Sequence, residues 1–145
     1  MYELKIGEGI GPIRLGMNRS EVLTVFNDLT EQREIPYGYD REIVSDCNAD
    51  FMIYYDAEDR VEFILCISPE KVEYCGRALL DHTIWELYVK LKEEDDAIDA
   101  DGEGFVSNHL GFGISIETGY DENERAYDLI QSVQVAVKNY WNSEQ

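Results

Sequence analysis

The sequence predicts a single α+β domain over residues 1–145: a mostly antiparallel sheet of about six to eight strands with two short helices packed on one face. Three observations lead to this prediction. The length of 145 residues suits one domain. Hydrophobic residues make up 44% of the chain, which is enough to form a core. Runs rich in aromatic and β-branched residues, typical of strands, outnumber the segments with helical periodicity.

The chain opens with a strand pattern. Residues 2–6 alternate between large apolar or aromatic side chains and charged ones, as expected of a half-buried strand. The glycines of residues 7–12 interrupt this alternation and predict a loop. A short apolar piece follows at residues 13–15.

A first helix is predicted over residues 19–28. Asn18 and Glu21 have the spacing of a capping box, in which the cap side chain and the later carboxylate each accept an amide hydrogen. Apolar residues behind them follow the i, i+3, i+4, i+7 pattern of one helix face. The polar residues 30–50 that come next predict turns rather than regular structure.

The middle of the chain predicts a β-hairpin. Residues 51–55 and 61–67 are rich in aromatic and β-branched side chains, and the polar residues 56–60 between them have the length of a hairpin turn. A further run at residues 72–75 is expected to extend this meander. Cys66 lies inside the second strand and is expected to be a small core residue.

A second helix is predicted over residues 84–94. Thr83 is its expected N-cap, with Glu86 as the reciprocal partner of a capping box. Its buried stripe is expected to consist of Ile84, Leu87, Tyr88 and Leu91.

The last third predicts more strands. Residues 104–106 and 111–117 are expected to pair around a connection at 107–110. A terminal strand is predicted over 129–137, because its valines recur at a spacing of two. A helix over 124–141 is the competing interpretation.

Charge restricts the partners of the chain. It carries 31 acidic and 12 basic residues, a formal net charge of −19. Binding to a phosphate backbone or an anionic membrane requires clusters of Lys and Arg, so neither is expected as a direct partner. The hydrophobic content is also too high for a disordered acidic tail.

The cysteines and the N-terminal residues favour the cytoplasm. The three cysteines are odd in number and lack metal-site spacing, so a disulfide framework is not expected. The chain opens without a basic segment followed by an apolar stretch, and no apolar run approaches about 18 residues. A reduced, cytoplasmic protein is therefore expected. The cysteines are Cys47, Cys66 and Cys75.

No motif predicts catalysis, a cofactor or a metal ion. His82 and His109 are expected to be structural or loop residues, since neither has a second ligand nearby in sequence. The glycines of residues 7–11 lack the Gly-Lys-Ser/Thr ending of a phosphate loop. An EF-hand register fails because Ala97 and Asn108 occupy its first and twelfth positions. A looser divalent-cation site in the same acidic stretch remains an alternative.

Negative charge is concentrated in residues 93–128. This segment, which we call the acidic segment, has twelve acidic residues and one basic residue, a net charge of −11. Concentrated like charge costs stability through self-repulsion, so it favours a compensating role such as attraction of a basic protein. The predicted partner-binding residues are Glu93, Glu94, Asp95, Asp96, Asp99, Asp101, Glu103, Glu117, Asp121 and Glu122, with Phe105 and Tyr120 as aromatic anchors.

The chain resembles the small, acidic, cytoplasmic immunity proteins that bacteria encode beside secreted polymorphic toxins. The resemblance is carried by short patches spread over the chain: GIGPIRLGM at 9–17 leading to SEV at 20–22, GFGI at 111–114, SVQV at 132–135 and KNYW at 138–141. It implies one-to-one binding and neutralisation of a toxin domain without catalysis. It implies no particular toxin activity.

The expected function is therefore that of an immunity protein, or antitoxin, that blocks a basic toxin by occlusion. A nuclease is the expected target, because its cleft must be positive to bind nucleic acid. A regulatory or adaptor module would use the same acidic surface and remains a second hypothesis, with a weak divalent-cation-binding domain or a small hydrolase as further ones. The expected oligomeric state is a monomer or a small homo-oligomer.

Overall fold

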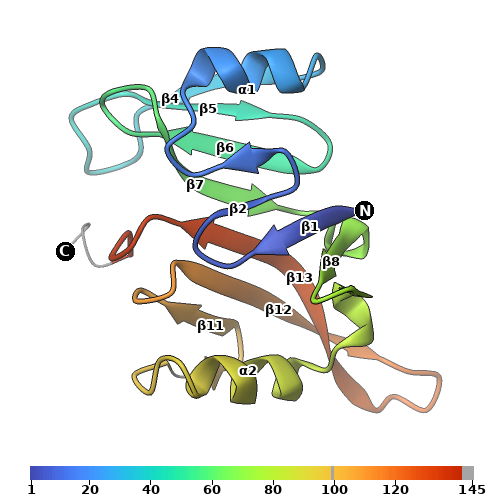
Figure 1. Ribbon diagram of the computed structural model, residues 1–145. Coiled ribbons are helices and arrows are strands. Elements are labelled where there is room, and N and C mark those ends of the chain that lie inside the picture. The colour runs from blue at the N-terminus through green and yellow to red at the C-terminus, as the bar shows by residue number, and fades with distance from the viewer. Residues whose placement is uncertain (99, 142–145) are drawn as a thin grey trace.

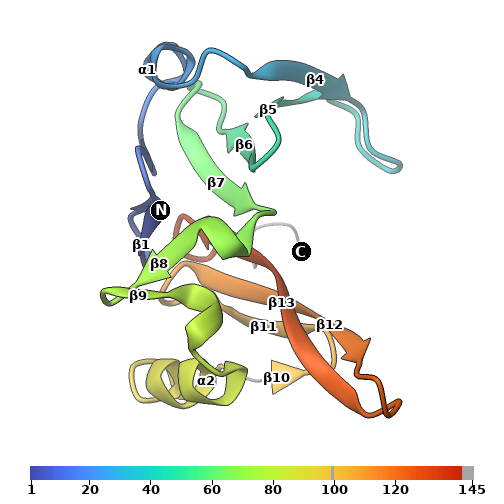
Figure 2. The same ribbon diagram turned by 90° about the vertical axis from the view of Figure 1, so that its right-hand side faces the viewer.

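In the computed structural model of the protein, thirteen strands of the described residues form two sheets (Figure 1). The structure describes residues 1–98 and 100–141, and at Asp101 it describes the backbone alone. Figure 2 shows that the two α-helices of the described residues and the smaller sheet lie on one side of the larger, strongly curved sheet. The prediction of an α+β domain with a mostly antiparallel sheet and two helices is confirmed.

The larger sheet has eight strands in the order β10-β11-β12-β13-β7-β6-β5-β4, all paired antiparallel. It consists of two meanders, β4 to β7 and β10 to β13, which join where residues 63–66 pair with residues 133–136. The hairpin predicted at 51–67 and the terminal strand are confirmed, and the alternative of a helix over 124–141 is wrong. The strands are β4 (Thr30–Glu34), β5 (Ile43–Cys47), β6 (Phe51–Tyr55), β7 (Val61–Cys66), β10 (Ala100–Asp101), β11 (Gly104–Ser107), β12 (Phe112–Tyr120) and β13 (Ala126–Ala136).

The smaller sheet has five strands in the order β3-β2-β1-β8-β9, with β1 and β8 parallel. The run at 72–75 was expected to extend the central meander, and this is wrong: it forms β8 and pairs with β1 instead. A 3₁₀ helix, η1 (Pro69–Lys71), turns the chain after β7, and β13 occupies the free edge of β7. The strands are β1 (Tyr2–Lys5), β2 (Gly9–Ile10), β3 (Ile13–Arg14), β8 (Val72–Tyr74) and β9 (Arg77–Ala78).

The two α-helices are α1 (Arg19–Val25) and α2 (Ile84–Lys92), the second preceded by the 3₁₀ helix η2 (Leu79–Asp81). Thr83 caps α2 as predicted, because its hydroxyl accepts a hydrogen bond from the Glu86 amide at 3.0 Å. The capping box predicted for α1 is wrong. The side chain of Asn18 accepts from the Ser20 hydroxyl at 2.9 Å and makes no hydrogen bond to the helix amides.

Residues 30–50 were predicted as turns but contain β4 and β5. All five residues of β4 are exposed, so the strand has no alternation of apolar and polar residues by which to recognise it. In β5 the two buried positions are polar, Ser45 and Asp46. The alternation of apolar and polar residues that predicts a strand arises from burial of apolar side chains. A strand that buries none does not show this pattern.

One hydrophobic core connects both sheets and both helices. Val22 from α1, Leu91 from α2, Ile10 from β2 and Phe51 from β6 are each at most 2% exposed and belong to the same cluster. Cys66 is fully buried in this cluster, as predicted. The core therefore holds the smaller sheet and the helices against the concave side of the larger sheet.

A buried ion pair attaches α1 to the larger sheet. Asp46 on β5 is 1% exposed, and both of its carboxylate oxygens accept hydrogen bonds from the Arg19 guanidinium at 2.9 Å. The Tyr55 hydroxyl donates a third hydrogen bond to Asp46, at 2.6 Å. A bidentate contact of this kind fixes the orientation of the guanidinium relative to the carboxylate as well as their distance. It therefore helps to set the angle at which α1 meets the sheet.

The same contacts set the protonation states of Asp46 and Tyr55. Burial alone would raise the pKa of Asp46, but the hydrogen bonds from Arg19 and Tyr55 outweigh burial and hold this pKa below its usual value. Burial and the adjacent Asp46 carboxylate raise the pKa of Tyr55, so its hydroxyl stays protonated and remains a donor.

Two hairpin turns, residues 56–60 and 121–125, have the same construction. In both, Oδ1 of a leading aspartate accepts hydrogen bonds from the amides of the third and fifth residues, at 2.8 and 3.1 Å in the first turn and 2.8 and 2.9 Å in the second. The fourth residue, Asp59 or Glu124, has a positive φ of 59° or 62°. This conformation strains a residue that has a Cβ atom.

We predict that Asp59→Gly and Glu124→Gly each raise the free energy of unfolding by about 0.5–1 kcal/mol, because glycine adopts a positive φ without that strain. Urea denaturation measures the change. The matched control is Ala57→Gly, at a position of the first turn where φ is not positive. This control is expected to leave stability unchanged or to lower it, and equal gains at all three positions would contradict the prediction.

We predict that Asp46→Asn lowers the free energy of unfolding by about 3 kcal/mol near pH 7, because it breaks a buried ion pair. The folded-state pKa of Asp46 is depressed, so its stabilising contribution is present above the unfolded pKa of about 3.9 and is lost as the pH falls through the folded value. The difference between wild type and variant should therefore shrink below about pH 4. Urea titrations across this range test the claim, and a pH-independent difference would refute it.

Candidate functional site

The acidic segment occupies one end of the molecule but forms two separate groups. The first is the acidic loop, which we define as residues 93–98 after α2. The second is the acidic hairpin, residues 117–128 of the β12–β13 hairpin and its turn. Figure 1 shows the loop at one end of α2 and the hairpin projecting past the other end. The two groups were expected to form one surface, and the structure places them at opposite ends of the same helix.

The acidic loop exposes three of its four predicted carboxylates. Glu93, Glu94 and Asp96 are exposed, whereas Asp95 is partly buried. Asp99 lies outside the described residues, and no side chain is described for Asp101.

Asp95 contributes to the fold rather than to the free surface. Its Oδ2 accepts a hydrogen bond from the Ser107 hydroxyl at 2.6 Å, and its Oδ1 accepts one from the Ala97 amide at 3.0 Å. The Ser107 oxygen in turn accepts from the Leu110 amide at 3.0 Å. The Ser107 hydrogen bond is the main reason that the pKa of Asp95 lies below its usual value. Asp95 therefore connects the acidic loop to the end of β11.

The acidic hairpin presents Glu117, Tyr120 and Glu122 to solvent, with Tyr120 67% exposed. Asp121 is also exposed, but its carboxylate organises the 121–125 turn as described above. Glu103 lies in the turn between β10 and β11, and its carbonyl accepts the Ile116 amide at 3.0 Å. Glu103 is thereby placed beside the base of the hairpin, away from the acidic loop.

Phe105 was predicted as an aromatic anchor for a partner, and this is wrong. It is 3% exposed and packs between Tyr88 of α2 and Phe112 of β12, with ring centroids 5.9 and 6.4 Å away. Its position on β11 faces the core, because it pairs with the buried Ile114. A partner could reach Phe105 only if the core opened.

Trp85 is an exposed aromatic residue that was not included in the prediction. It lies in the first turn of α2, is 70% exposed and contacts the Tyr88 ring at 5.7 Å between centroids. Val89, one turn later, is 40% exposed. The sequence pattern already indicated that Trp85 is exposed, because this residue falls outside the predicted buried stripe of the helix. Tryptophan outside a buried stripe is a common hot-spot residue of interfaces.

The basic residues that form ion pairs lie elsewhere in the molecule. Arg19 and Arg33 bind carboxylates of β4, β5 and the loop between these strands, and Lys71 binds Asp50 at 3.1 Å. Arg125 is the single basic residue of the acidic segment. α2 also carries Lys90 and Lys92 in its last turn, and Lys92 donates a hydrogen bond to the Ile98 carbonyl of the acidic loop at 2.7 Å, so lysines balance part of the negative charge at this end.

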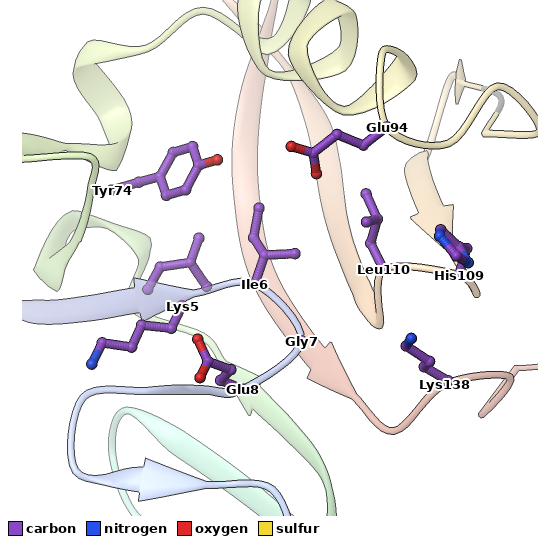
Figure 3. A pocket seen from close by; sticks show the side chains of 10 residues that line it. Lys5, Ile6, Gly7, Glu8, Tyr74, Glu94, His109, Leu110 and Lys138 are labelled. Carbon is purple, nitrogen blue, oxygen red and sulfur yellow. The ribbon is translucent and has the colours of Figure 1, made fainter.

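An open cleft of about 600 Å³ lies beside the acidic loop, between the turn after β1 and the loop at 109–110. Figure 3 shows Glu94 and Tyr74 across the cleft from each other, and Lys138 beside His109. Two lysines and two glutamates line it, so it favours neither a cationic nor an anionic ligand. No serine, threonine or cysteine is among its described lining residues, and Tyr74 supplies a phenolic hydroxyl.

His82 has a structural position. Its side chain is 10% exposed, its Nε2 lies 3.1 Å from the Tyr74 carbonyl, and its Nδ1 lies 3.9 Å from Glu86. It directly precedes the N-cap of α2, as predicted from the sequence.

Within residues 1–98 and 100–141, no group of three or more His, Cys, Asp or Glu side chains is arranged to hold a metal ion. The loose divalent-cation alternative depends on Asp99 and Asp101, which fall outside that search or have no described side chain. No helix of the described residues has both the length and the apolar character needed to cross a membrane.

Comparison of the chain with models of known protein families, with curated proteins and with solved structures finds no match.

We predict that Asp95→Asn lowers the free energy of unfolding by about 1 kcal/mol and Ser107→Ala by more, because Ser107→Ala also removes the acceptor of the Leu110 amide. The double variant should lose little more than Ser107→Ala alone, because the Asp95–Ser107 hydrogen bond is common to both changes. Ser107→Ala should also raise the pKa of Asp95 toward its ordinary value, since that bond is the main cause of the depression. Urea denaturation and an NMR pH titration measure these effects. The matched control Asp96→Asn, at an exposed position, should change stability by less than about 0.5 kcal/mol. If the double variant lost the sum of the two single losses in free energy of unfolding, the two residues would not be coupled and the prediction would be wrong.

Proposed function

We propose that this protein is a cytoplasmic immunity protein that binds a basic toxin domain, in our view a nuclease, and neutralises it by occlusion without catalysis. The observation that carries the proposal is the end of the molecule around α2 and the β12–β13 hairpin. The acidic segment has twelve acidic residues and one basic residue in its sequence, whereas α2, which precedes it, carries Lys90 and Lys92 in its last turn; large aromatic side chains are exposed at this end.

Electrostatics supports a positively charged partner. An excess of carboxylates at one end of a protein gives it a directional field, which speeds encounter with a surface of opposite charge. A nuclease must carry such a surface in its substrate cleft, because it binds a polyanion. An acidic end that enters this cleft takes the place of the nucleic-acid backbone and blocks the substrate.

Exposed aromatic residues supply the apolar part of such an interface. Trp85 is 70% exposed, Tyr120 is 67% exposed and Tyr127 is 46% exposed. Trp85 belongs to α2, and the two tyrosines belong to the hairpin that projects beyond it (Figure 1). An aromatic centre with a charged rim is the usual composition of a tight protein interface, since burial supplies the binding free energy and the charges supply orientation.

The protein–partner contact is expected to leave the fold of the acidic end unchanged. The hairpin turn is held by the Asp121 carboxylate, and the acidic loop is held by Asp95. Segments that are ordered before binding lose less conformational entropy when they bind. This favours an inhibitor that acts by filling a site.

The test uses the secreted toxin encoded beside the gene as the binding partner, with calorimetry at two salt concentrations. Two charge-reversal variants separate the acidic groups: Glu93→Arg with Glu94→Arg and Asp96→Arg for the loop, and Glu117→Arg with Glu122→Arg for the hairpin. We predict that at least one of them raises Kd by about a hundredfold and removes most of the salt dependence. Trp85→Ala should raise Kd at least about tenfold.

The matched control is Glu58→Arg with Glu70→Arg, two exposed glutamates outside the acidic segment. This variant should bind within about threefold of wild type. If the control and both acidic variants changed Kd by the same factor, the acidic end would not be part of the interface. Absence of salt-sensitive binding to that toxin would refute the proposed function itself.

A further inference from the structure

Among the described residues, β4 (Thr30–Glu34) is the terminal strand of the larger sheet and pairs with another strand on one side only. It pairs with β5 through all five residues, and the strand order ends there. All five side chains are exposed. An edge strand presents backbone N–H and C=O groups that another strand can pair with. The opposite edge of the sheet, β10, has only two residues.

The sequence of β4 is complementary to itself when two copies run antiparallel. With a two-fold axis at Gln32, Glu31 of one copy lies opposite Arg33 of the second, and this pair occurs twice. Opposite charges directly across an antiparallel pair are stabilising. A shift of one residue in either direction destroys this match, so the register is specified.

The same register continues beyond the strand with an apolar contact. Leu29 of one copy falls opposite Ile35 of the second, on the same face as the charged pairs, because side chains alternate along a strand. Ile35 is 63% exposed in the single chain, and Leu29 already packs in part against the core. Both ends of the paired strands would therefore carry an apolar contact.

Charge also favours this end of the molecule for self-association. Residues 14–47, which include α1, β4 and β5, hold four basic and seven acidic residues, a net charge of −3, against −11 for the acidic segment. Two copies of a strongly acidic chain repel each other least where their surfaces are least negative. In Figure 2, β4 lies at the end of the larger sheet away from α2 and the β12–β13 hairpin.

The side chains that would make the contact are already ordered. Arg33 forms ion pairs with Glu31 and with Glu42, the latter at 2.6 Å, and Glu31 also contacts Arg19 at 3.2 Å. A guanidinium has five N–H donors, so Arg33 retains donors for a carboxylate of a second copy.

We propose that two copies of this chain associate through β4, in an antiparallel pairing centred on Gln32 that joins two eight-stranded sheets into one. The contact is symmetric, so it closes after two copies. It leaves the acidic end of each copy free, and it is independent of the proposed function.

The test is sedimentation velocity of the full chain from about 1 μM to about 1 mM, where a reversible monomer–dimer equilibrium is expected. Glu31→Arg places two arginines opposite each other, and Arg33→Glu places two glutamates opposite each other. Each variant alone should therefore raise the dimer Kd at least about tenfold. An equimolar mixture of the two variants restores both opposite-charge pairs, so it should form a mixed dimer with a Kd near that of wild type.

The mixture also controls for damage to the local ion-pair network, because an unfolded variant would not regain dimerisation on mixing. As a further control, Glu70→Arg at an exposed site far from β4 in the sheet order should leave Kd unchanged. A wild-type chain that remains monomeric up to about 1 mM would overturn the proposal. A dimer that is insensitive to both charge variants would overturn the β4 register.

Discussion

Residues 63–66 of β7 pair with residues 133–136 of β13, and this short ladder makes one sheet out of two meanders. Within each meander, strands that are neighbours in the sequence are joined by turns. The residues that pair between β7 and β13, by contrast, are separated in the sequence by about half the length of the chain. Cys66, Ile64, Val133 and Val135 are fully buried at this junction. The helices and the smaller sheet pack over the curved surface that results, so the one continuous core depends on a contact between segments that are distant in sequence.

The polar side chains in this fold have two distinct roles. Asp46, Asp95 and the turn aspartates accept several hydrogen bonds each and hold elements in place. Glu93, Glu94, Glu117 and Glu122 are exposed and keep their charge at the surface. Acidic residues that are adjacent in the sequence, such as Glu94 and Asp95, can fall into different classes. A net charge therefore overstates the number of carboxylates that are available to a partner.

The two ends of the molecule differ in charge, and this gives them different capacities for association. The end around α2 and the β12–β13 hairpin is strongly negative and displays Trp85 and Tyr120, which suits a positive protein surface. The end around α1 and β4 is much less negative and presents a strand edge that no other described strand pairs with, which suits a second copy of the chain. Because the larger sheet separates these ends, both contacts can form on one molecule.

The fold class, both helices, the 51–67 hairpin and the terminal strand could be predicted from the sequence, because burial of apolar side chains leaves a periodic pattern in each. The sequence also located the concentration of carboxylates, which depends on composition alone. Tertiary structure decided which residues face a partner. Phe105 is buried because the register of β11 and β12 turns it toward the core, while the adjacent Val106 points outward. It also decided the edge: β4 has no apolar face, so its pairing with β5 makes it a strand and places it at the end of the sheet.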